Sequence, residues 1–262
     1  MSVLIYRSKH GVSKRGWVVL VHGLGEYSGR AGYQRFIELL NDNGFAVYAF
    51  DLPGHGRSSG KRGHTTIEEI MKIIDDIVND IGEKPYLFGH SLGGLTVLRY
   101  GEVYPDKIRG LIVSSPALTL GVKLSRAQTL MLRILKIIAP STTVNNRIDP
   151  MKLSRSREAV ERYITDKLIH MRVSIALIDS MIDNIRKVYE EADKIKVPVL
   201  MLIGTSDVIT LPIGAKALYE KLKVSDKTLK EFPEAYHEIF EDPEWSNEFY
   251  ETIVGWLLKQ SV

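Results

Sequence analysis

The sequence of 262 residues contains no cysteine. Without cysteine there is no disulfide, no thiolate metal site and no cysteine nucleophile, so any covalent catalysis must use another side chain. Long apolar runs are also absent: no stretch reaches the roughly 18 uncharged residues of a membrane span, and the N-terminus does not have the pattern of a signal peptide. We therefore expect a globular, cytoplasmic protein.

Excess charge of one sign is low as well. The formal net charge is only +3, which is too small to indicate a nucleic-acid partner. The charge is unevenly distributed, because residues 117–190 hold 13 Lys and Arg against 7 Asp and Glu. One interpretation of this basic segment is an ordinary solvated helical surface. The other is attraction to an anionic lipid surface or to acidic substrate headgroups, which predicts peripheral contact with a membrane.

Short apolar runs bounded by turn residues recur along the chain, and several are apolar nearly throughout, as in strands covered on both faces. Helical patterns lie between them at Tyr33 to Asn41, Thr66 to Ile81 and Leu95 to Val103. Strands that alternate with helices predict an α/β fold with a mostly parallel, doubly wound sheet. The expected strands are Val3 to Tyr6, Trp17 to Val21, Phe45 to Phe50, Tyr86 to Phe88, Ile108 to Val113, Val197 to Ile203 and Thr228 to Phe232.

The alternation stops between Ala117 and about Tyr189. Apolar residues recur there at helical spacing in two series, with no expected strand between them. We interpret this segment, 117–189, as a helical cap inserted into a core domain formed by residues 1–116 and 190–262. The two series are Leu124, Ala127, Met131, Ile134, Leu135, Ile138 and Ile164, Leu168, Met171, Ile175, Ile178, Ile182, Ile185.

The most informative motif is Gly89-His90-Ser91-Leu92-Gly93-Gly94, which follows an expected strand and leads into an expected helix. This context places Ser91 on a sharp strand-to-helix turn, the usual position of a serine nucleophile. A side chain two residues before or after the serine would crowd the neighbouring strand or helix, which explains the glycines. The motif predicts a catalytic serine rather than a plain glycine-rich turn.

A catalytic serine needs a base to accept its proton, and the base needs an acid to hold its tautomer. After a nucleophile on such a turn the base comes last in the chain, and His237 is the only histidine beyond residue 170. We expect the acid to be Asp207, because it follows Val197 to Ile203 at the sheet edge where parallel strands place their sites. Asp226, in a polar turn, is the second choice.

Attack on a carbonyl carbon develops negative charge on oxygen, which backbone N–H groups must stabilise. One donor is expected to be the N–H of Leu92, the residue after the nucleophile. The other is expected to be the N–H of Leu24 in the loop after Trp17 to Val21. The same loop has glycines like those of a dinucleotide-binding fingerprint, but their spacing is wrong and that interpretation leaves Ser91 without a role.

Five segments resemble the monoacylglycerol lipase and lysophospholipase branch of the α/β-hydrolase superfamily. The likeness covers nearly the whole sheet domain in order, whereas the cap is matched only loosely. The first segment is the most discriminating, because the others also occur in general esterases. The segments are His22-Gly-Leu-Gly-Glu-Tyr-Ser-Gly-Arg30, Asp51-Leu-Pro-Gly-His-Gly-Arg-Ser-Ser-Gly60, Gly89 to Gly94, Gly204-Thr-Ser-Asp207 and Ala235-Tyr-His-Glu238.

The resemblance implies an α/β-hydrolase fold and hydrolysis of a single-acyl lipid ester, foremost monoacylglycerol to glycerol and free fatty acid. The reaction would pass through an acyl-enzyme on Ser91 and need no cofactor or metal. The resemblance also implies that Glu26 and Arg30 hold the glycerol end of the substrate, the alternative being an ordinary loop ion pair. Where the family usually has histidine after this glutamate, the chain has Tyr27.

Several other functions share the same scaffold. A broad carboxylesterase, a lysophospholipase, a proline-iminopeptidase-like hydrolase or a non-catalytic receptor would keep the fold, so the fold alone does not decide among them. The loop with Glu26 and Arg30 and the apolar cap favour lipid esters, since an acyl chain needs a flexible apolar lining.

Overall fold

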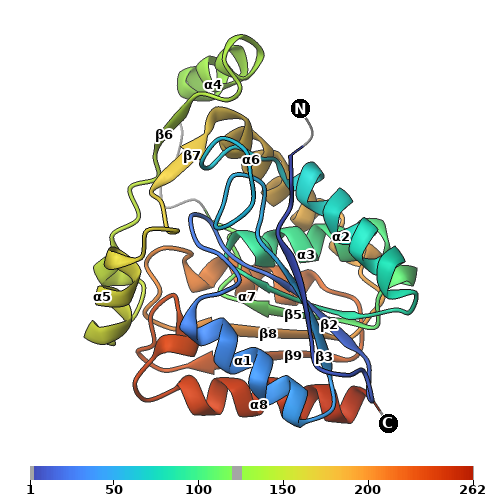
Figure 1. Cartoon of the computed structure of the whole chain (residues 1–262). Coiled ribbons are helices and arrows are strands. Elements are labelled where there is room, and N and C mark those ends of the chain that lie inside the picture. Colours follow the sequence, from blue (N-terminus) through green and yellow to red (C-terminus); the bar gives the residue numbers. More distant parts are fainter. Residues whose placement is uncertain (1–2, 120–125, 262) are drawn as a thin grey trace.

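The computed structural model describes residues 3–119 and 126–261. Its centre is a seven-stranded sheet in the order β1-β3-β2-β4-β5-β8-β9 (Figure 1). All neighbouring strands are parallel except β1, which pairs antiparallel with β3. The doubly wound, mostly parallel sheet is therefore confirmed. The strands are β1 (Arg7–His10), β2 (Trp17–Val21), β3 (Ala46–Phe50), β4 (Tyr86–His90), β5 (Gly110–Ser114), β8 (Val199–Gly204) and β9 (Lys227–Phe232).

The first strand lies later in the chain than the sequence predicted. The expected strand, Val3 to Tyr6, is not in the sheet, and β1 is Arg7–His10 instead. The backbone oxygen of Tyr6 accepts a hydrogen bond from the N–H of Asp51 at 3.0 Å, so this segment binds the loop after β3 rather than a strand. Leu4 is 78% exposed, which shows that the apolar run does not mark a buried strand.

Helices cover both faces of the sheet, with a buried apolar cluster under each layer. On one face lie α1 (Ala31–Asp42) and α8 (Ser246–Gln260), and on the other lie α2 (Ile67–Ile81), α3 (Leu92–Val103) and α7 (Pro212–Lys221) (Figure 1). In the described part of the chain, no helix combines the length and apolarity that crossing a bilayer requires. The packing of α3 against β4 and β5 fixes the start of that helix at the sheet edge, where Ser91 lies.

Between β5 and β8 the chain leaves the sheet and forms the segment predicted as the cap. This segment contains a two-stranded antiparallel sheet, so the expectation of helices without a strand between them was wrong. The second helical series is divided, because a turn and a short strand separate α5 from α6. Strands of three residues are too short to give a periodic signal. The elements are α4 (Arg126–Ile138), β6 (Thr143–Asn145), α5 (Arg157–Thr165), β7 (Arg172–Ser174) and α6 (Ile175–Glu190).

The cap elements differ in how closely they approach the core. Helix α6 packs on α3, and its buried side chains join the core cluster on that face of the sheet. Helix α4 forms the far tip of the molecule and contacts α6 (Figure 1). Leu124, which began the first helical series, lies outside the described residues.

Candidate active site

Ser91 occupies a strained turn between β4 and α3. Its backbone angles are φ 54° and ψ −114°, in a region that residues other than glycine rarely adopt. The N–H of Ser91 donates to the oxygen of Ser114 at 3.0 Å, and its own oxygen accepts from the N–H of Ala117 at 3.0 Å. The end of β5 thus holds the turn from both sides. Ser91 is partly exposed, whereas the residues next to it are buried.

The glycines around Ser91 have the steric role that the sequence predicted. A Cβ atom at Gly89 would collide with the backbone oxygen of Gly93, and one at Gly93 would collide with the oxygen of Val21 on β2. Backbone atoms cannot move aside as a flexible side chain can. The tight packing of α3 against β2 and β4 therefore requires glycine at both positions.

Asp207 and His237 form a buried pair at the same edge of the sheet. Asp207 follows β8 and His237 follows β9, and both are only 3% exposed. The His237 Nδ1–H donates to Asp207 Oδ2 at 2.8 Å. The His237 ring lies 4.7 Å, centroid to centroid, from the ring of His90, the residue before Ser91. The three residues of the expected triad thus lie beyond the carboxyl ends of their strands, on one edge.

Asp226, the second choice for the acid, lies elsewhere. Its carboxylate accepts a hydrogen bond from Gln260 Nε2 at 2.7 Å, and its backbone oxygen binds the N–H of Val199 at the start of β8. Asp226 is therefore at the opposite edge of the sheet. Of the two candidates, only Asp207 contacts His237.

The electrostatics of the pair suit a base held by an ionised acid. Burial alone would raise the pKa of Asp207, but the attraction of His237 and hydrogen bonds from His237 and Thr210 keep that pKa below its usual value. Burial alone would lower the pKa of His237, but the charge of Asp207 and its hydrogen bond raise it. Burial and the neighbouring His237 lower the pKa of His90 to about 3, so His90 is neutral. The arrangement keeps a negative carboxylate behind one protonatable imidazole.

The loop after β2 is rigidly held by its own side chains. The N–H of Gly23 donates to Glu26 Oε1 at 2.6 Å. His22 Nε2 accepts from the N–H of Leu52 at 2.9 Å. These bonds fix the backbone around Leu24. Leu92 is the first residue of α3, so its N–H has no partner within that helix. The assignment of both N–H groups to an oxyanion hole stays a prediction.

Glu26 and Arg30, the expected substrate-binding residues, lie in a buried charged cluster. Arg30 pairs with Glu26 and makes two hydrogen bonds to the Glu238 carboxylate, at 2.6 and 2.8 Å. The exposed fractions of Glu26, Arg30 and Glu238 are only 3%, 5% and 2%. Burial would raise the pKa of Glu26, but the Arg30 guanidinium, His90, His22 and the hydrogen bond from Tyr33 together lower it to about 2. Contact of these side chains with a substrate stays a prediction.

Glu238 was not singled out from the sequence. The residue follows His237 directly, and through Arg30 it ties the histidine loop to the loop that begins at Gly23. A single glutamate beside a catalytic histidine gives no sequence signal of this role. Only the fold brings it next to Arg30, 208 residues away in the chain.

The cap is fastened to the loops of the site by hydrogen bonds. The N–H of His170 donates to the oxygen of Gly25 at 2.9 Å, and a Cβ atom at Gly25 would collide with the His170 backbone. Next to His237, the N–H of Glu238 donates to the oxygen of Leu153 at 2.7 Å. The Tyr27 hydroxyl donates to Asp166 at 2.8 Å, which gives a structural role to the residue that departs from the family pattern.

Within residues 3–119 and 126–261, no group of three or more His, Asp or Glu side chains is arranged to hold a metal ion. The strained Ser91 turn and the His237–Asp207 pair lie at one edge of the sheet, and their use as nucleophile, base and acid stays a prediction.

Comparison with known proteins agrees with this geometry. A family model described as "Serine aminopeptidase, S33" matches residues 12–244. The chain is 31% identical over 237 residues to the monoacylglycerol lipase of Mycolicibacterium smegmatis, covering 88% of this chain and 84% of that protein. It is 32% identical over 271 residues to an uncharacterized abhydrolase domain-containing protein of Dictyostelium discoideum, covering 98% of this chain but only 29% of that protein's length.

A solved structure is closely similar over the whole chain. The crystal structure of the Paleococcus ferrophilus monoacylglycerol lipase is 57% identical, with a TM-score of 0.94, and the match covers 98% of this chain and 99% of that one. The α/β-hydrolase fold and the resemblance to monoacylglycerol lipases are thereby confirmed. Because the family model matches residues 12–244, which is most of the chain, the chain belongs to the serine aminopeptidase S33 family.

Proposed function

We propose that this protein is a serine hydrolase that cleaves monoacylglycerol to glycerol and free fatty acid. The observation that carries the proposal is the strained Ser91 turn at the same sheet edge as the buried His237–Asp207 pair. The identity of 57% to a monoacylglycerol lipase supports the substrate class.

In the proposed mechanism Ser91 Oγ attacks the ester carbonyl carbon while His237 Nε2 accepts the hydroxyl proton. Asp207 accepts the Nδ1–H and stabilises the imidazolium. The N–H groups of Leu24 and Leu92 donate to the oxyanion. His237 then gives its proton to the glycerol oxygen, which leaves. A water molecule, deprotonated by His237, attacks the acyl-enzyme, and the fatty acid departs as the proton returns to Ser91.

We assign Glu26, Arg30 and Glu238 to holding the oxyanion loop in place. Support comes from their burial and from the hydrogen bond between Glu26 and the Gly23 N–H, next to the proposed donor Leu24. A glycerol hydroxyl could reach these charges only if one side chain left the cluster, which would leave a buried charge unpaired. Direct contact with glycerol is thus the less favoured role.

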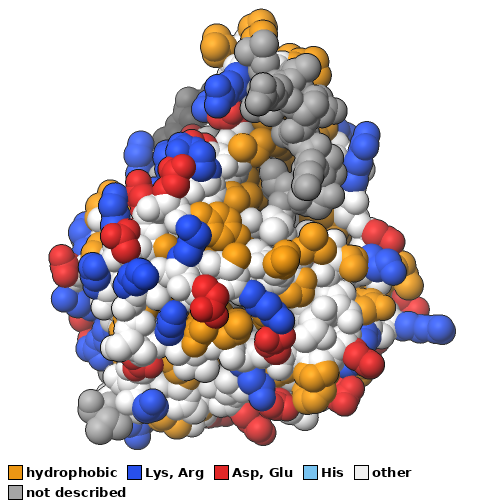
Figure 2. All heavy atoms as spheres, turned by 180° about the vertical axis from the view of Figure 1, so that it is seen from behind, with side chains coloured by type: hydrophobic (Ala, Val, Ile, Leu, Met, Phe, Trp, Pro, Cys, Tyr) orange, Lys and Arg blue, Asp and Glu red, His pale blue; other side chains and the backbone are white. Residues whose placement is uncertain are grey.

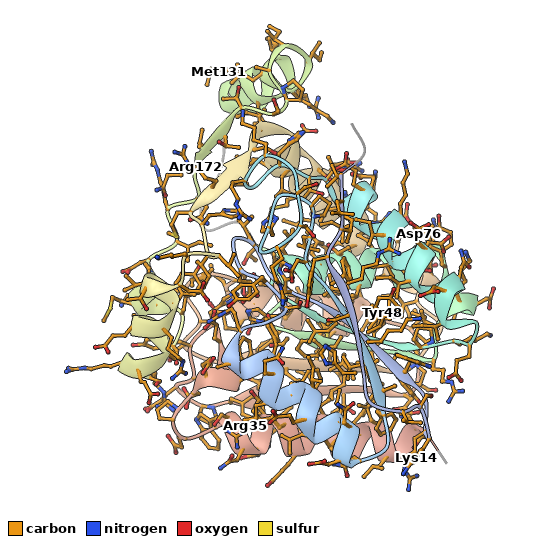
Figure 3. The ribbon with its side chains drawn as sticks, viewed as in Figure 1. Lys14, Arg35, Tyr48, Asp76, Met131 and Arg172 are labelled. Carbon is orange, nitrogen blue, oxygen red and sulfur yellow. The ribbon has the colours of Figure 1, made fainter. Side chains whose placement is uncertain are left out.

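The cap tip suits contact with a lipid surface. Apolar side chains project from α4 into solvent, with exposed fractions of 58% for Met131, 83% for Ile137 and 74% for Ile138. Helix α4 lies at the end of the molecule farthest from the sheet, where Figure 2 shows exposed hydrophobic side chains and Figure 3 labels Met131. Lys136 on the same helix is paired with Asp179 of α6 at 2.5 Å, so the exposed apolar side chains carry the argument for an interfacial role. We therefore propose peripheral membrane contact through this tip.

The main rival is a peptidase on the same scaffold, because the matched family is described as serine aminopeptidase. A panel of monoacylglycerols, lysophospholipids, short p-nitrophenyl esters and amino-acid amides separates the two. We expect the monoacylglycerols to give the highest kcat/KM. Preferred turnover of the amides would refute the proposed substrate class.

The serine assignment has its own test. We expect Ser91→Ala to lose at least about 10³-fold in activity while it keeps the same melting temperature, since a triad member acts as part of a unit. A matched control is Ser206→Ala, an exposed serine beside Asp207, which should keep full activity. A fluorophosphonate probe should label the wild-type protein and the control but not Ser91→Ala. Labelling of Ser91→Ala would contradict the assignment.

A further inference from the structure

Thr210 lies between β8 and α7, three residues after Asp207, and is 7% exposed. Its hydroxyl oxygen is within hydrogen-bond distance of three atoms in the site. These are Asp207 Oδ2 at 2.8 Å, the backbone oxygen of Ser115 at 3.0 Å and His237 Nδ1 at 3.2 Å. Thr210 therefore contacts both members of the acid–base pair, although neither its sequence position nor the mechanism above assigns it a role.

The single hydroxyl proton decides what these contacts mean. Two of the three neighbours, the Asp207 carboxylate and the Ser115 carbonyl, are acceptors only. An ionised carboxylate is the stronger acceptor and is at the shorter distance, so the proton points to Asp207 Oδ2. His237 Nδ1–H donates to the same oxygen atom. Two donors thus share one carboxylate oxygen.

The hydroxyl is not needed to orient the carboxylate. The other oxygen, Oδ1, accepts hydrogen bonds from the backbone N–H groups of Ile209 and Thr210, at 2.8 and 3.0 Å. These donors remain whatever side chain stands at position 210. The distinct contribution of the hydroxyl is therefore to the negative charge on Oδ2, the atom that faces His237.

We propose that Thr210 is a positioning residue that acts through Asp207: its hydroxyl draws on the charge of Oδ2 and so limits how tightly Asp207 holds the protonated His237. This inference rests on the proposed triad. The limit matters because His237 must be neutral to accept the serine proton and must release that proton to the leaving oxygen. A carboxylate with one donor fewer would favour the imidazolium and retain the base in its charged, inactive form at a higher pH.

The other groups around His237 are unaffected by a change at position 210. Besides Asp207, the carboxylates of Glu238 and Glu26 raise its pKa, while burial lowers it. The neutral ring of His90 lies beside it at an interplanar angle of 53°, and Arg30 is paired with two glutamates. A shift in the titration of His237 caused by Thr210 variants can therefore be assigned to Oδ2.

The test is the pH dependence of kcat/KM for a soluble short-chain ester, measured for the wild type, Thr210→Val and Thr210→Ser. Valine keeps the shape and removes the donor, whereas serine keeps the donor. A hydrogen bond to a charged group corresponds to about one to two pKa units, of which part reaches His237, so we expect the acid limb of Thr210→Val to move up by about 0.5 to 1 pH unit. At pH values below the limb, kcat/KM of Thr210→Val should be roughly 3- to 10-fold lower than that of the wild type, while the plateau value of kcat/KM changes by less than about 3-fold. Thr210→Ser should keep the wild-type limb.

The matched control is Thr65→Val, another buried threonine whose hydroxyl donates to a carboxylate, Glu69 at 3.2 Å, outside the site. Its acid limb should not move. An unshifted or lowered limb in Thr210→Val, or the valine shift reproduced by serine, would overturn the inference. If Thr210→Val does not fold, Thr210→Cys replaces it, and this weaker donor must shift the limb upward by a smaller amount. A wrong assignment of the triad would be recognised separately, because Ser91→Ala would then keep most of the wild-type activity.

Discussion

Replacing Arg30 by methionine should expose how much the buried charged cluster costs when its cation is removed. Met keeps an unbranched side chain of similar length but leaves Glu26 and Glu238 facing each other without the guanidinium between them. Removing one partner of a buried ion pair typically destabilises a protein by about 3–5 kcal/mol. For a chain of this size that corresponds to a fall in Tm of roughly 6–12 °C.

The loss should depend on pH, and its sign follows from Glu26. In the wild type, the pKa of Glu26 is lowered to about 2, so its ionisation stabilises the fold fully above the pKa of the unfolded chain, and this contribution is lost as the pH falls from there through the folded value of about 2. Without Arg30, burial raises the Glu26 pKa, and the ionised form opposes folding at neutral pH. As the pH falls toward 5, the carboxyl binds a proton and part of the loss is recovered. The difference in Tm between the two proteins should therefore be larger at pH 7.5 than at pH 5.

Thermal melts of three variants at the two pH values make the comparison. Arg186→Met is the matched control, since Arg186 is an exposed residue that pairs with Asp183 and Glu190. Pairs of this kind contribute at most about 1 kcal/mol. In the third variant Arg30→Met is combined with Glu26→Gln and Glu238→Gln, which removes the uncompensated charge and should regain stability. A Tm loss equal at both pH values, or no recovery in the third variant, would refute the reasoning.

Three further changes test other parts of the structure. Asp207→Asn should lower kcat by about 10³- to 10⁴-fold without unfolding the protein, because an amide favours the wrong tautomer of His237; steady-state kinetics and melts measure both. Gly25→Ala should lower kcat and stability together, since the new methyl group meets the His170 backbone at φ 81°, and normal kinetics would count against the cap contact. Ile137→Glu should weaken cosedimentation with anionic vesicles while hydrolysis of a soluble ester stays unchanged, and equal vesicle binding would exclude a lipid role for the tip.

The sequence predicted the parts of the fold whose signals are local. The run Trp17 to Val21 is apolar throughout and forms β2, and the helical pattern Thr66 to Ile81 corresponds to α2, with Thr66 and Glu69 forming a capping box at its start. The glycines around Ser91 indicated its turn for a steric reason that the structure confirms. Each of these features depends on a few neighbouring residues, so it can be recognised without knowledge of the fold.

Features that depend on distant contacts were not predictable in the same way. Strand β7 is extended because it forms hydrogen bonds to β6 and to the loop at Gly63. A segment of three residues is too short to predict this pairing from the sequence. Glu238 gains its role from Arg30, which only the folded chain brings near. The role of Asp207 could be expected from its place after a strand. The hydrogen bond from the Thr210 hydroxyl to Asp207 Oδ2, the atom that also contacts His237, could be recognised only from the structure.

The hydrogen bonds that fasten the cap to the loops of the site come from the part of it that lies next to the site. The oxygen of Gly25 is held by His170, and the N–H of Glu238 is held by Leu153, so the lower cap braces the neighbourhoods of both the proposed oxyanion donors and the base. Helix α4 makes neither of these two bonds. A displacement of α4 alone would therefore break neither bond, and the backbone next to Leu24 and His237 would keep its present support.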